Sequence, residues 1–224
     1  MSASAAAPGS ALVLFDLDGT LTRHDTLLPY LAGFLLRHPA GVLRLPRALA
    51  MLARFAVGGA DRGELKSAWI RALLGGHSRA EIEAWTERFV PRLLRRGLRP
   101  DARAAIERHR RGGDRLVLLS ASPDLYVPAI AHALGFAESV STGVKWDGDR
   151  LEGSLTTANR RGAEKARYVT TLRSRHPQLP IVAYANAASD LEHLVLADRA
   201  ALVNGGWRSR RAAARRAIAC LRWR

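Results

Sequence analysis

The sequence FDLDGTLT (residues 15–22) places two carboxylates, Asp16 and Asp18, directly after the apolar run at residues 11–15. The length of that run predicts a short buried strand rather than a helix. Asp16 then stands at the carboxyl end of the strand, and in open α/β sheets ligands bind in the crevice beyond those ends. The stretch therefore predicts an α/β fold and the position of its functional site.

The chain from residue 24 to residue 97 shows helical periodicity, and no strand pattern interrupts it. Apolar residues recur at helical spacing, first from Leu27 to Leu35. Two helix starts have the spacing of a capping box: Asp61 with Glu64, and Ser78 with Glu81. These patterns predict a helical insertion.

An alternating pattern of helices and strands returns after Pro100. We predict helices at 101–111, 124–134, 162–173 and 190–197, strands at 115–119, 181–184 and 201–203, and a hairpin turn at 147–149. Such alternation is typical of a mostly parallel sheet covered on both faces. The predicted fold class is therefore α/β, with a Rossmann-like sheet, helices on both of its faces and an inserted all-helical cap.

The predicted domain organisation follows from these boundaries. Residues 1–10 are expected to be a flexible lead, 11–23 together with 98–207 the core domain, 24–97 the cap, and 208–224 a basic C-terminal helix. That last segment holds seven arginines and no acid. It can bind an anionic surface or dock on the core through its apolar residues, and its helical periodicity favours docking.

The formal charge of +15 comes from 35 basic residues, of which only Lys66, Lys145 and Lys165 are lysines. This uniform use of arginine indicates basic residues spread over the solvent-exposed surface rather than a patch that binds nucleic acid. We do not expect nucleic acid as a partner. Peripheral membrane contact stays open, and the oligomeric state is not predicted. The single cysteine and the lack of a signal-peptide pattern favour a cytoplasmic location.

The two acids of the opening motif suit phosphoryl transfer. A carboxylate at Asp16 can attack phosphorus and form an aspartyl-phosphate, and Asp18 can protonate the leaving oxygen and later activate water. The alternative is that both acids merely cap a loop, because acids are common in turns.

FDLDGTLT resembles the first motif of the haloacid dehalogenase superfamily of phosphatases. Three later motifs follow in the family's order: Leu116 to Leu119 with Ser120, Lys165 within NRRGAEK (159–165), and IVAYANAASD (181–190). The resemblance spans residues 11 to 204. The insertion resembles the helical cap of the phosphoserine-phosphatase-like branch.

The resemblance implies specific roles. The catalytic residues would be Asp16, Asp18, Ser120 and Lys165. The cofactor would be Mg²⁺, bound by the Asp16 carboxylate, the Asp18 carbonyl, Asn186 and Asp190, since hard oxygen ligands suit this ion. Substrate contacts would come from Asp25, Thr20 and Ser122, although Asp25 can equally cap the helix that begins near Thr26.

One motif departs from the family pattern. Where the family usually has Gly-Asp or Gly-Asn-Ser, this chain has Ala185-Asn186-Ala187. An amide at Asn186 can bind Mg²⁺ but brings no charge, and Ala185 adds a side chain where close backbone approach can matter. Two hypotheses follow: a magnesium-dependent phosphatase of a small phosphorylated metabolite or lipid phosphate, or a catalytically weakened relative that binds a phosphorylated ligand or an anionic surface.

A third hypothesis rests on the apolar stretch from Leu27 to Val57. Under this hypothesis the protein is a membrane-surface enzyme that acts on a lipid or prenyl phosphate, and its basic residues hold it to anionic lipid.

Overall fold

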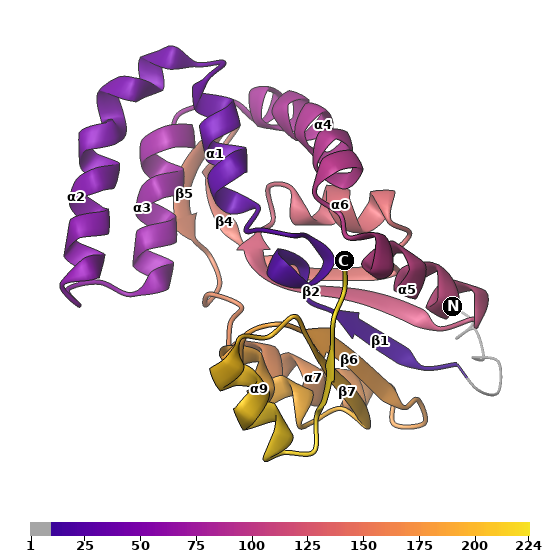
Figure 1. The fold of residues 1–224 in the computed structure, drawn as a ribbon. Coiled ribbons are helices and arrows are strands. Elements are labelled where there is room, and N and C mark those ends of the chain that lie inside the picture. The colour runs from indigo at the N-terminus through magenta and orange to yellow at the C-terminus, as the bar shows by residue number, and fades with distance from the viewer. Residues whose placement is uncertain (1–9) are drawn as a thin grey trace.

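The centre of the fold is a six-stranded sheet, and the computed structural model describes residues 10–224 (Figure 1). The strand order is β3-β2-β1-β6-β7-β8, and each neighbouring pair is parallel. The strands are β1 (Leu12–Phe15), β2 (Arg115–Pro123), β3 (Glu138–Thr142), β6 (Ile181–Ala185), β7 (Arg199–Val203) and β8 (Ala219–Leu221). The predicted α/β class with a mostly parallel sheet is confirmed. Residues 1–9, most of the predicted lead, lie outside the described residues.

Strand β1 lies between β2 and β6 and is buried on both faces. Val13 and Phe15 point into one core, whereas Leu12 and Leu14 point into the other, as the alternation of side chains along a strand requires. Burial on both sides explains why the strand reads as a continuous apolar run.

Helices cover both faces of the sheet. The core that contains Phe15 is covered by α5 (Pro100–Arg111), α6 (Val127–Ala133) and the inserted helices, and the opposite core by α7 (Ala163–Arg175), α8 (Leu191–Leu194) and α9 (Trp207–Ala214). At the carboxyl ends of β1, β2 and β6, residues of the sheet share a cavity with residues of the inserted helices.

The insertion forms four helices with a short helical turn, η2 (Pro39–Arg44), before the second of them (Figure 1). The four are α1 (Leu27–Leu35), α2 (Leu45–Ala56), α3 (Arg62–Leu74) and α4 (Arg79–Arg96). Both predicted capping boxes form: Asp61 starts α3, and Ser78 starts α4. Within residues 10–224, no helix combines the length and the apolar character needed to span a bilayer.

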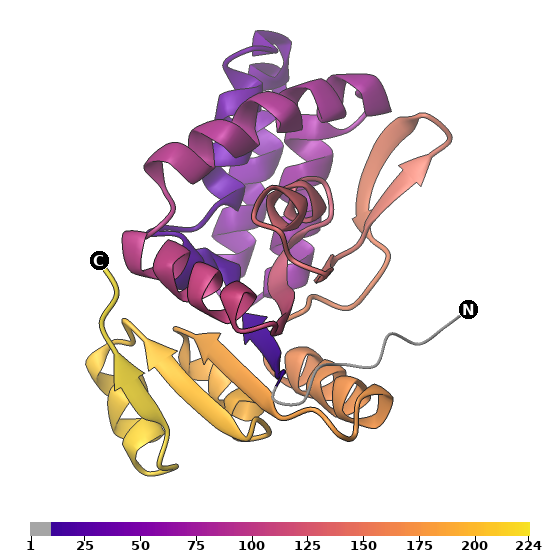
Figure 2. The ribbon, with the colours of Figure 1, turned by 90° about the vertical axis from the view of Figure 1, so that its right-hand side faces the viewer.

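A hairpin of β4 (Val144–Asp147) and β5 (Arg150–Leu155) forms at the predicted turn but lies beside the cap (Figure 2). Its Leu151 exchanges backbone hydrogen bonds with the turn after α3, accepting from Gly76 at 2.8 Å and donating to His77 at 2.9 Å. Gly153, at φ +94°, lets β5 approach α3, since a Cβ there would lie 2.8 Å from the Arg71 backbone. The hairpin, which falls in the predicted core segment, thus packs against the cap.

The prediction of one helix over 208–224 is wrong. Helix α9 ends at Ala214, Ala217 has φ +54°, and β8 then pairs with β7 at the edge of the sheet. Ile218 is buried in the core, so the short apolar stretch gains both packing and backbone hydrogen bonds that a continued arginine-rich helix would not provide.

Candidate active site

The strand ends and the cap enclose one cavity of about 460 Å³. The core contributes Asp16, Asp18, Ser122, Asn159, Lys165, Asn186 and Asp190 to its lining, and the cap contributes Asp25 and, from α3, Arg62, Leu65, Lys66 and Trp69. Its position beyond the carboxyl ends of parallel strands is the one that the sequence predicts.

Asp16 follows β1 directly, and its carboxylate is held on both oxygens. Oδ1 accepts a hydrogen bond from the Lys165 ammonium at 2.6 Å, and Oδ2 accepts one from the Thr20 hydroxyl at 2.8 Å. Burial raises the pKa of Asp16 to about 6, against the opposing effect of Lys165 and with a further rise from Asp190. The carboxylate is therefore oriented, buried and still mainly ionised at neutral pH.

Lys165 is buried near the start of α7, between two carboxylates. Its Nζ lies 2.6 Å from Asp16 and 3.0 Å from Asp190. Burial alone would lower the pKa of Lys165, but the two carboxylates outweigh it and raise the pKa, so the side chain is charged.

The acids of the site outnumber its buried cation. The buried carboxylates of Asp16 and Asp190 share the one ammonium of Lys165, and the nearby His193 does not compensate because burial lowers its pKa to about 4. This arrangement leaves one negative charge in excess beside Lys165, which a bound cation would balance.

The donor set fits Mg²⁺. Carboxylate and amide oxygens are the hard ligands this ion prefers, and Asp16, Asn186 and Asp190 all line the cavity. The buried Ser189 hydroxyl has no hydrogen-bond partner among the described residues and also lines the cavity, so it is free to bind a water of the ion or a ligand.

The Asp18 carboxylate points toward the start of the cap. Its Oδ1 accepts from the Thr26 amide and hydroxyl, both at 2.7 Å, and its Oδ2 accepts from the Ser122 hydroxyl at 2.6 Å. Burial raises the pKa of Asp18, opposed by these hydrogen bonds. A carboxyl group with a raised pKa suits a general acid, and the sequence reasoning missed Thr26 as its support.

The three predicted substrate contacts have different surroundings. Asp25 lines the cavity and also caps α1, accepting from the Leu27 amide at 2.9 Å, so its two predicted roles are compatible. Ser122 lines the cavity while it holds Asp18. Thr20 is not part of the cavity lining: its side chain is fully buried and orients Asp16, and its predicted substrate contact stays a prediction.

Ser120 also lies away from the cavity lining. Its hydroxyl is fully buried and accepts from the Ser122 amide at 3.0 Å. Because β2 continues as far as Pro123, the residues that reach the cavity are Ala121 and Ser122. The predicted catalytic role of Ser120 stays a prediction, and the hydroxyl that lines the cavity in this structure is that of Ser122, two residues further on.

The motif that departs from the family pattern, Ala185-Asn186-Ala187, leaves the shape of the cavity intact. Ala185 is fully buried in the core behind the sheet, so its methyl group does not enter the cavity. Asn186 lies against Gly19, whose φ is +79°: a Cβ on Gly19 would come 2.0 Å from the Asn186 amide nitrogen. The first motif thus needs glycine at this position. The departure reaches the cavity through the neutral amide of Asn186 and through Ala187, whose methyl group also lines it.

Lys66 is the principal site residue that sequence reasoning missed. From α3 it reaches across the cavity and donates to the Ala121 carbonyl at 2.5 Å and to the Asn159 side chain at 2.6 Å. Burial lowers the pKa of Lys66 to about 8. The signal was the rarity of lysine in an arginine-rich chain.

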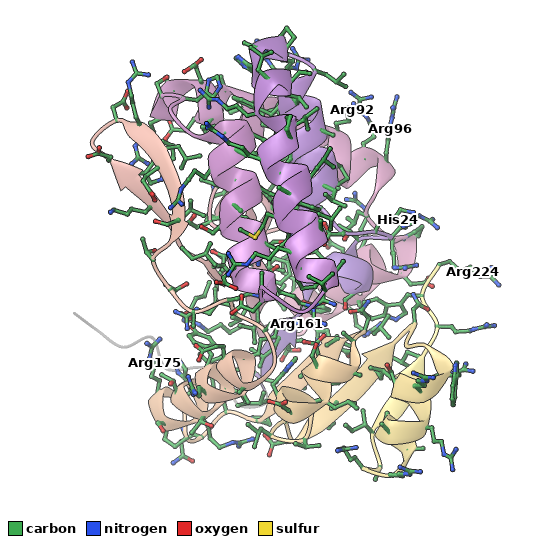
Figure 3. All side chains as sticks on the ribbon, turned by 90° about the vertical axis from the view of Figure 1, so that its left-hand side faces the viewer. His24, Arg92, Arg96, Arg161, Arg175 and Arg224 are labelled. Atoms are coloured by element: carbon green, nitrogen blue, oxygen red, sulfur yellow. The ribbon has the colours of Figure 1, made fainter. Side chains whose placement is uncertain are left out.

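Three arginines surround the same cavity. Arg23, Arg62 and Arg161 line it, and Figure 3 shows Arg161 below the lower ends of α2 and α3. With Lys66 they make the mouth of the cavity attractive to anions.

Comparisons with known proteins identify relatives of this chain. The model of the haloacid dehalogenase-like hydrolase family matches residues 13–194. Protein CicA of Caulobacter vibrioides is 38% identical over 199 residues, which cover 84% of this chain and 83% of the relative. A crystal structure of a Bordetella pertussis Tohama I protein of unknown function has a TM-score of 0.79 at 24% identity, covering 95% of this chain and 98% of that one. A phospho-aspartyl intermediate analogue of phosphoserine phosphatase has a TM-score of 0.64 at 16% identity, covering 95% and 93%.

Proposed function

Because this chain belongs to the haloacid dehalogenase-like hydrolase family and has the fold of the phosphoserine phosphatases, we propose that it is a magnesium-dependent phosphomonoesterase. The observation that carries the proposal is the buried cluster in which Lys165 touches both Asp16 and Asp190 at the bottom of a cavity with cations at its mouth. The substrate class is a small phosphorylated metabolite or a lipid phosphate.

The reaction would proceed in two displacements. An Asp16 oxygen attacks phosphorus, a bond forms between them, and the ester bond to the leaving oxygen breaks while Asp18 gives that oxygen a proton. Asp18 then takes a proton from water, which attacks the aspartyl-phosphate and releases phosphate from Asp16. Thr20 and Lys165 orient the attacking carboxylate.

Charge develops on the phosphoryl oxygens during both displacements. Lys165 supplies a fixed positive charge next to Asp16, in a buried site where such a charge is worth more than in water. Mg²⁺, held by Asp16, Asn186, Asp190 and the Asp18 carbonyl, would supply Lewis-acid stabilisation of the same oxygens.

The direct test is a panel of phosphomonoesters assayed with and without Mg²⁺. We expect phosphate release that disappears with a chelator and returns with Mg²⁺. Failure to release phosphate from any ester at saturating Mg²⁺ would contradict catalysis by this chain.

Lys66 is expected to set an alkaline limit on substrate capture. Its pKa of about 8 lies below the 10.5 of a lysine in water, so the ammonium is lost as the pH rises through 8. An anionic substrate then loses a cationic contact, and kcat/KM, which reports the free enzyme, should fall above about pH 8. In Lys66→Arg the guanidinium stays charged, so the alkaline limb should move up by at least about one pH unit.

The control is Lys145→Arg, since Lys145 is exposed on β4. Its pH profile should match that of the unaltered chain. An unchanged alkaline limb in Lys66→Arg would show that another group titrates there.

The second candidate function is a catalytically weakened protein that binds a phosphorylated ligand, and the neutral amide of Asn186 favours it. Asn186→Asp adds a charged oxygen beside Gly19, where the amide now lies. The dissociation constant for Mg²⁺, measured by calorimetry, should fall about tenfold or more, because affinity rises with the charge of the ligand set.

Turnover separates the two functions. Phosphate release by the unaltered chain at saturating Mg²⁺ supports the phosphatase, whereas release that begins only in Asn186→Asp supports the weakened protein. An unchanged Mg²⁺ affinity would mean that Asn186 is not a ligand.

A further inference from the structure

The outer side of α2, with the last turn of η2 before it and Val57 after it, carries an unpartnered apolar stripe. Six residues recur there at helical spacing and are all exposed: Leu43, Pro46, Leu49, Ala50, Ala53 and Val57, which we call the outer cap stripe. Leu43 is 86% exposed, Leu49 60% and Val57 83%. Ala48, on the inner side, is buried, and its carbonyl accepts from the Trp69 indole of α3 at 3.0 Å. The helix therefore has a second apolar side that its own fold does not use.

The charged residues of the segment that carries the stripe are of one sign. The segment from residue 26 to residue 60 contains four arginines and no Asp or Glu. Arg47 and Arg54, seven residues apart, lie on the same side of α2, next to the stripe, and both are exposed. Apolar residues flanked by cations are typical of a helix that lies in the interface of an anionic bilayer.

The position of α2 exposes the stripe. In Figure 1 the helix is the outermost element of the cap, with α3 between it and the rest of the molecule, and in Figure 3 it faces the viewer. The turn at its end leads into Arg62, which lines the active-site cavity. A surface bound by the stripe would thus come close to the mouth of the cavity.

We propose that the outer cap stripe docks the protein on anionic lipid bilayers, with α2 lying in the plane of the interface. Exposed apolar residues of this size and continuity mark interaction surfaces. The uniform positive charge selects the partner, because arginines beside an anionic surface attract it.

A second copy of the chain fits the stripe less well. In a two-fold dimer the same segment packs on itself. Arg47 and Arg54 would then meet their own copies, with no acid in residues 26–60 to pair with them. An anionic bilayer meets the same surface with complementary charge.

Sedimentation with vesicles tests the docking. The full chain is mixed at low salt with vesicles of phosphatidylcholine alone or of phosphatidylcholine with phosphatidylglycerol. Binding to the mixed vesicles only, weakening as salt is added, is the expected result. No binding to the mixed vesicles at low salt, or equal binding to both kinds, would overturn the proposal.

Two variants locate the contact. Leu43→Ser combined with Leu49→Ser removes apolar residues from the stripe and should weaken vesicle binding at least about tenfold. Val195→Ser with Leu196→Ser is the matched control, since both side chains are exposed apolar residues outside the cap. It should bind as the unaltered chain does, and an equal loss in the control would overturn the assignment to α2.

The charge contribution is tested by Arg47→Glu, which should weaken binding at least about fivefold, as expected for loss of one cation at the surface. Arg92→Glu makes the same change of net charge on α4, on the other side of the cap (Figure 1). Arg92→Glu should weaken vesicle binding clearly less than Arg47→Glu does. An equal weakening would show that net charge rather than this surface drives binding.

Two further measurements separate docking from other outcomes. Sedimentation equilibrium that shows a dimer abolished by the two leucine substitutions would replace the bilayer with a second copy. Hydrolysis of p-nitrophenyl phosphate should be unaffected by these substitutions, because none of the altered residues lines the cavity. Loss of docking and loss of catalysis are thereby distinguishable.

Discussion

Asp16→Asn is expected to lower phosphomonoester turnover at least about a thousandfold, because removing a covalent nucleophile typically costs that much or more. Asparagine can keep the hydrogen bond from Thr20, and Lys165 keeps its ion pair with Asp190, so the fold should persist. Turnover of p-nitrophenyl phosphate at saturating Mg²⁺ measures the loss, and circular dichroism checks the fold.

Asp147→Asn is the matched control for the same chemical change. Asp147 ends β4, is exposed and lies outside the cavity lining. Its turnover should stay within about twofold of the unaltered chain, as for most surface substitutions. Turnover that survives in Asp16→Asn would rule out the aspartyl-phosphate route.

Lys165→Met is expected to have the largest effect on stability. The substitution leaves Asp16 and Asp190 buried without their shared cation, and breaking a buried ion pair on one side costs about 3–5 kcal/mol. Denaturation by urea in the presence of a chelator measures the change. Turnover should be lost as well, because the charge next to the attacking carboxylate is gone.

The pH dependence of that variant has a definite sign. Without Lys165 the two buried carboxylates favour the protonated form, so their folded pKa values rise above the unfolded ones. Their protonation then stabilises the folded state at low pH, and the deficit should be smaller at pH 5 than at pH 8.

Lys145→Met provides the comparison for Lys165→Met, since Lys145 is exposed. It should change the free energy of unfolding by less than about 0.5 kcal/mol. A similarly small change in Lys165→Met would mean that the two acids do not depend on the lysine for charge compensation.

Local signals explain what the sequence could predict. β1 and the two acids after it could be recognised because the apolar strand and the acids follow one another directly in the sequence. The starts of α3 and α4 could be recognised for the same reason, since a capping box spans only four residues.

Features that depend on distant partners could not be predicted. β3 is a half-buried polar strand, and β8 follows an arginine-rich helix, so each is defined by the neighbouring strand rather than by its own pattern. Lys66 is a site residue only because Ala121 and Asn159, far along the chain, come within reach of its ammonium.

The burial of the Ser120 and Thr20 hydroxyls could not be predicted for a related reason. Motif order indicates which segments meet but not how far a strand continues or which way a hydroxyl turns. β2 runs on to Pro123, and Thr20 turns toward Asp16, so both hydroxyls end inside the protein.

The hairpin β4–β5 restricts the movements of the cap that can accompany substrate entry and product release. It leaves the core at Gly143, returns at Thr156 and is fastened to the α3 end by the paired backbone bonds of Leu151. The cap and the hairpin packed on it are thus joined to the core by four chain segments instead of two. A large rotation of the cap would have to move the hairpin with it. Substrate entry and product release are therefore expected to depend on small movements at the mouth of the cavity, next to the turn between α2 and α3.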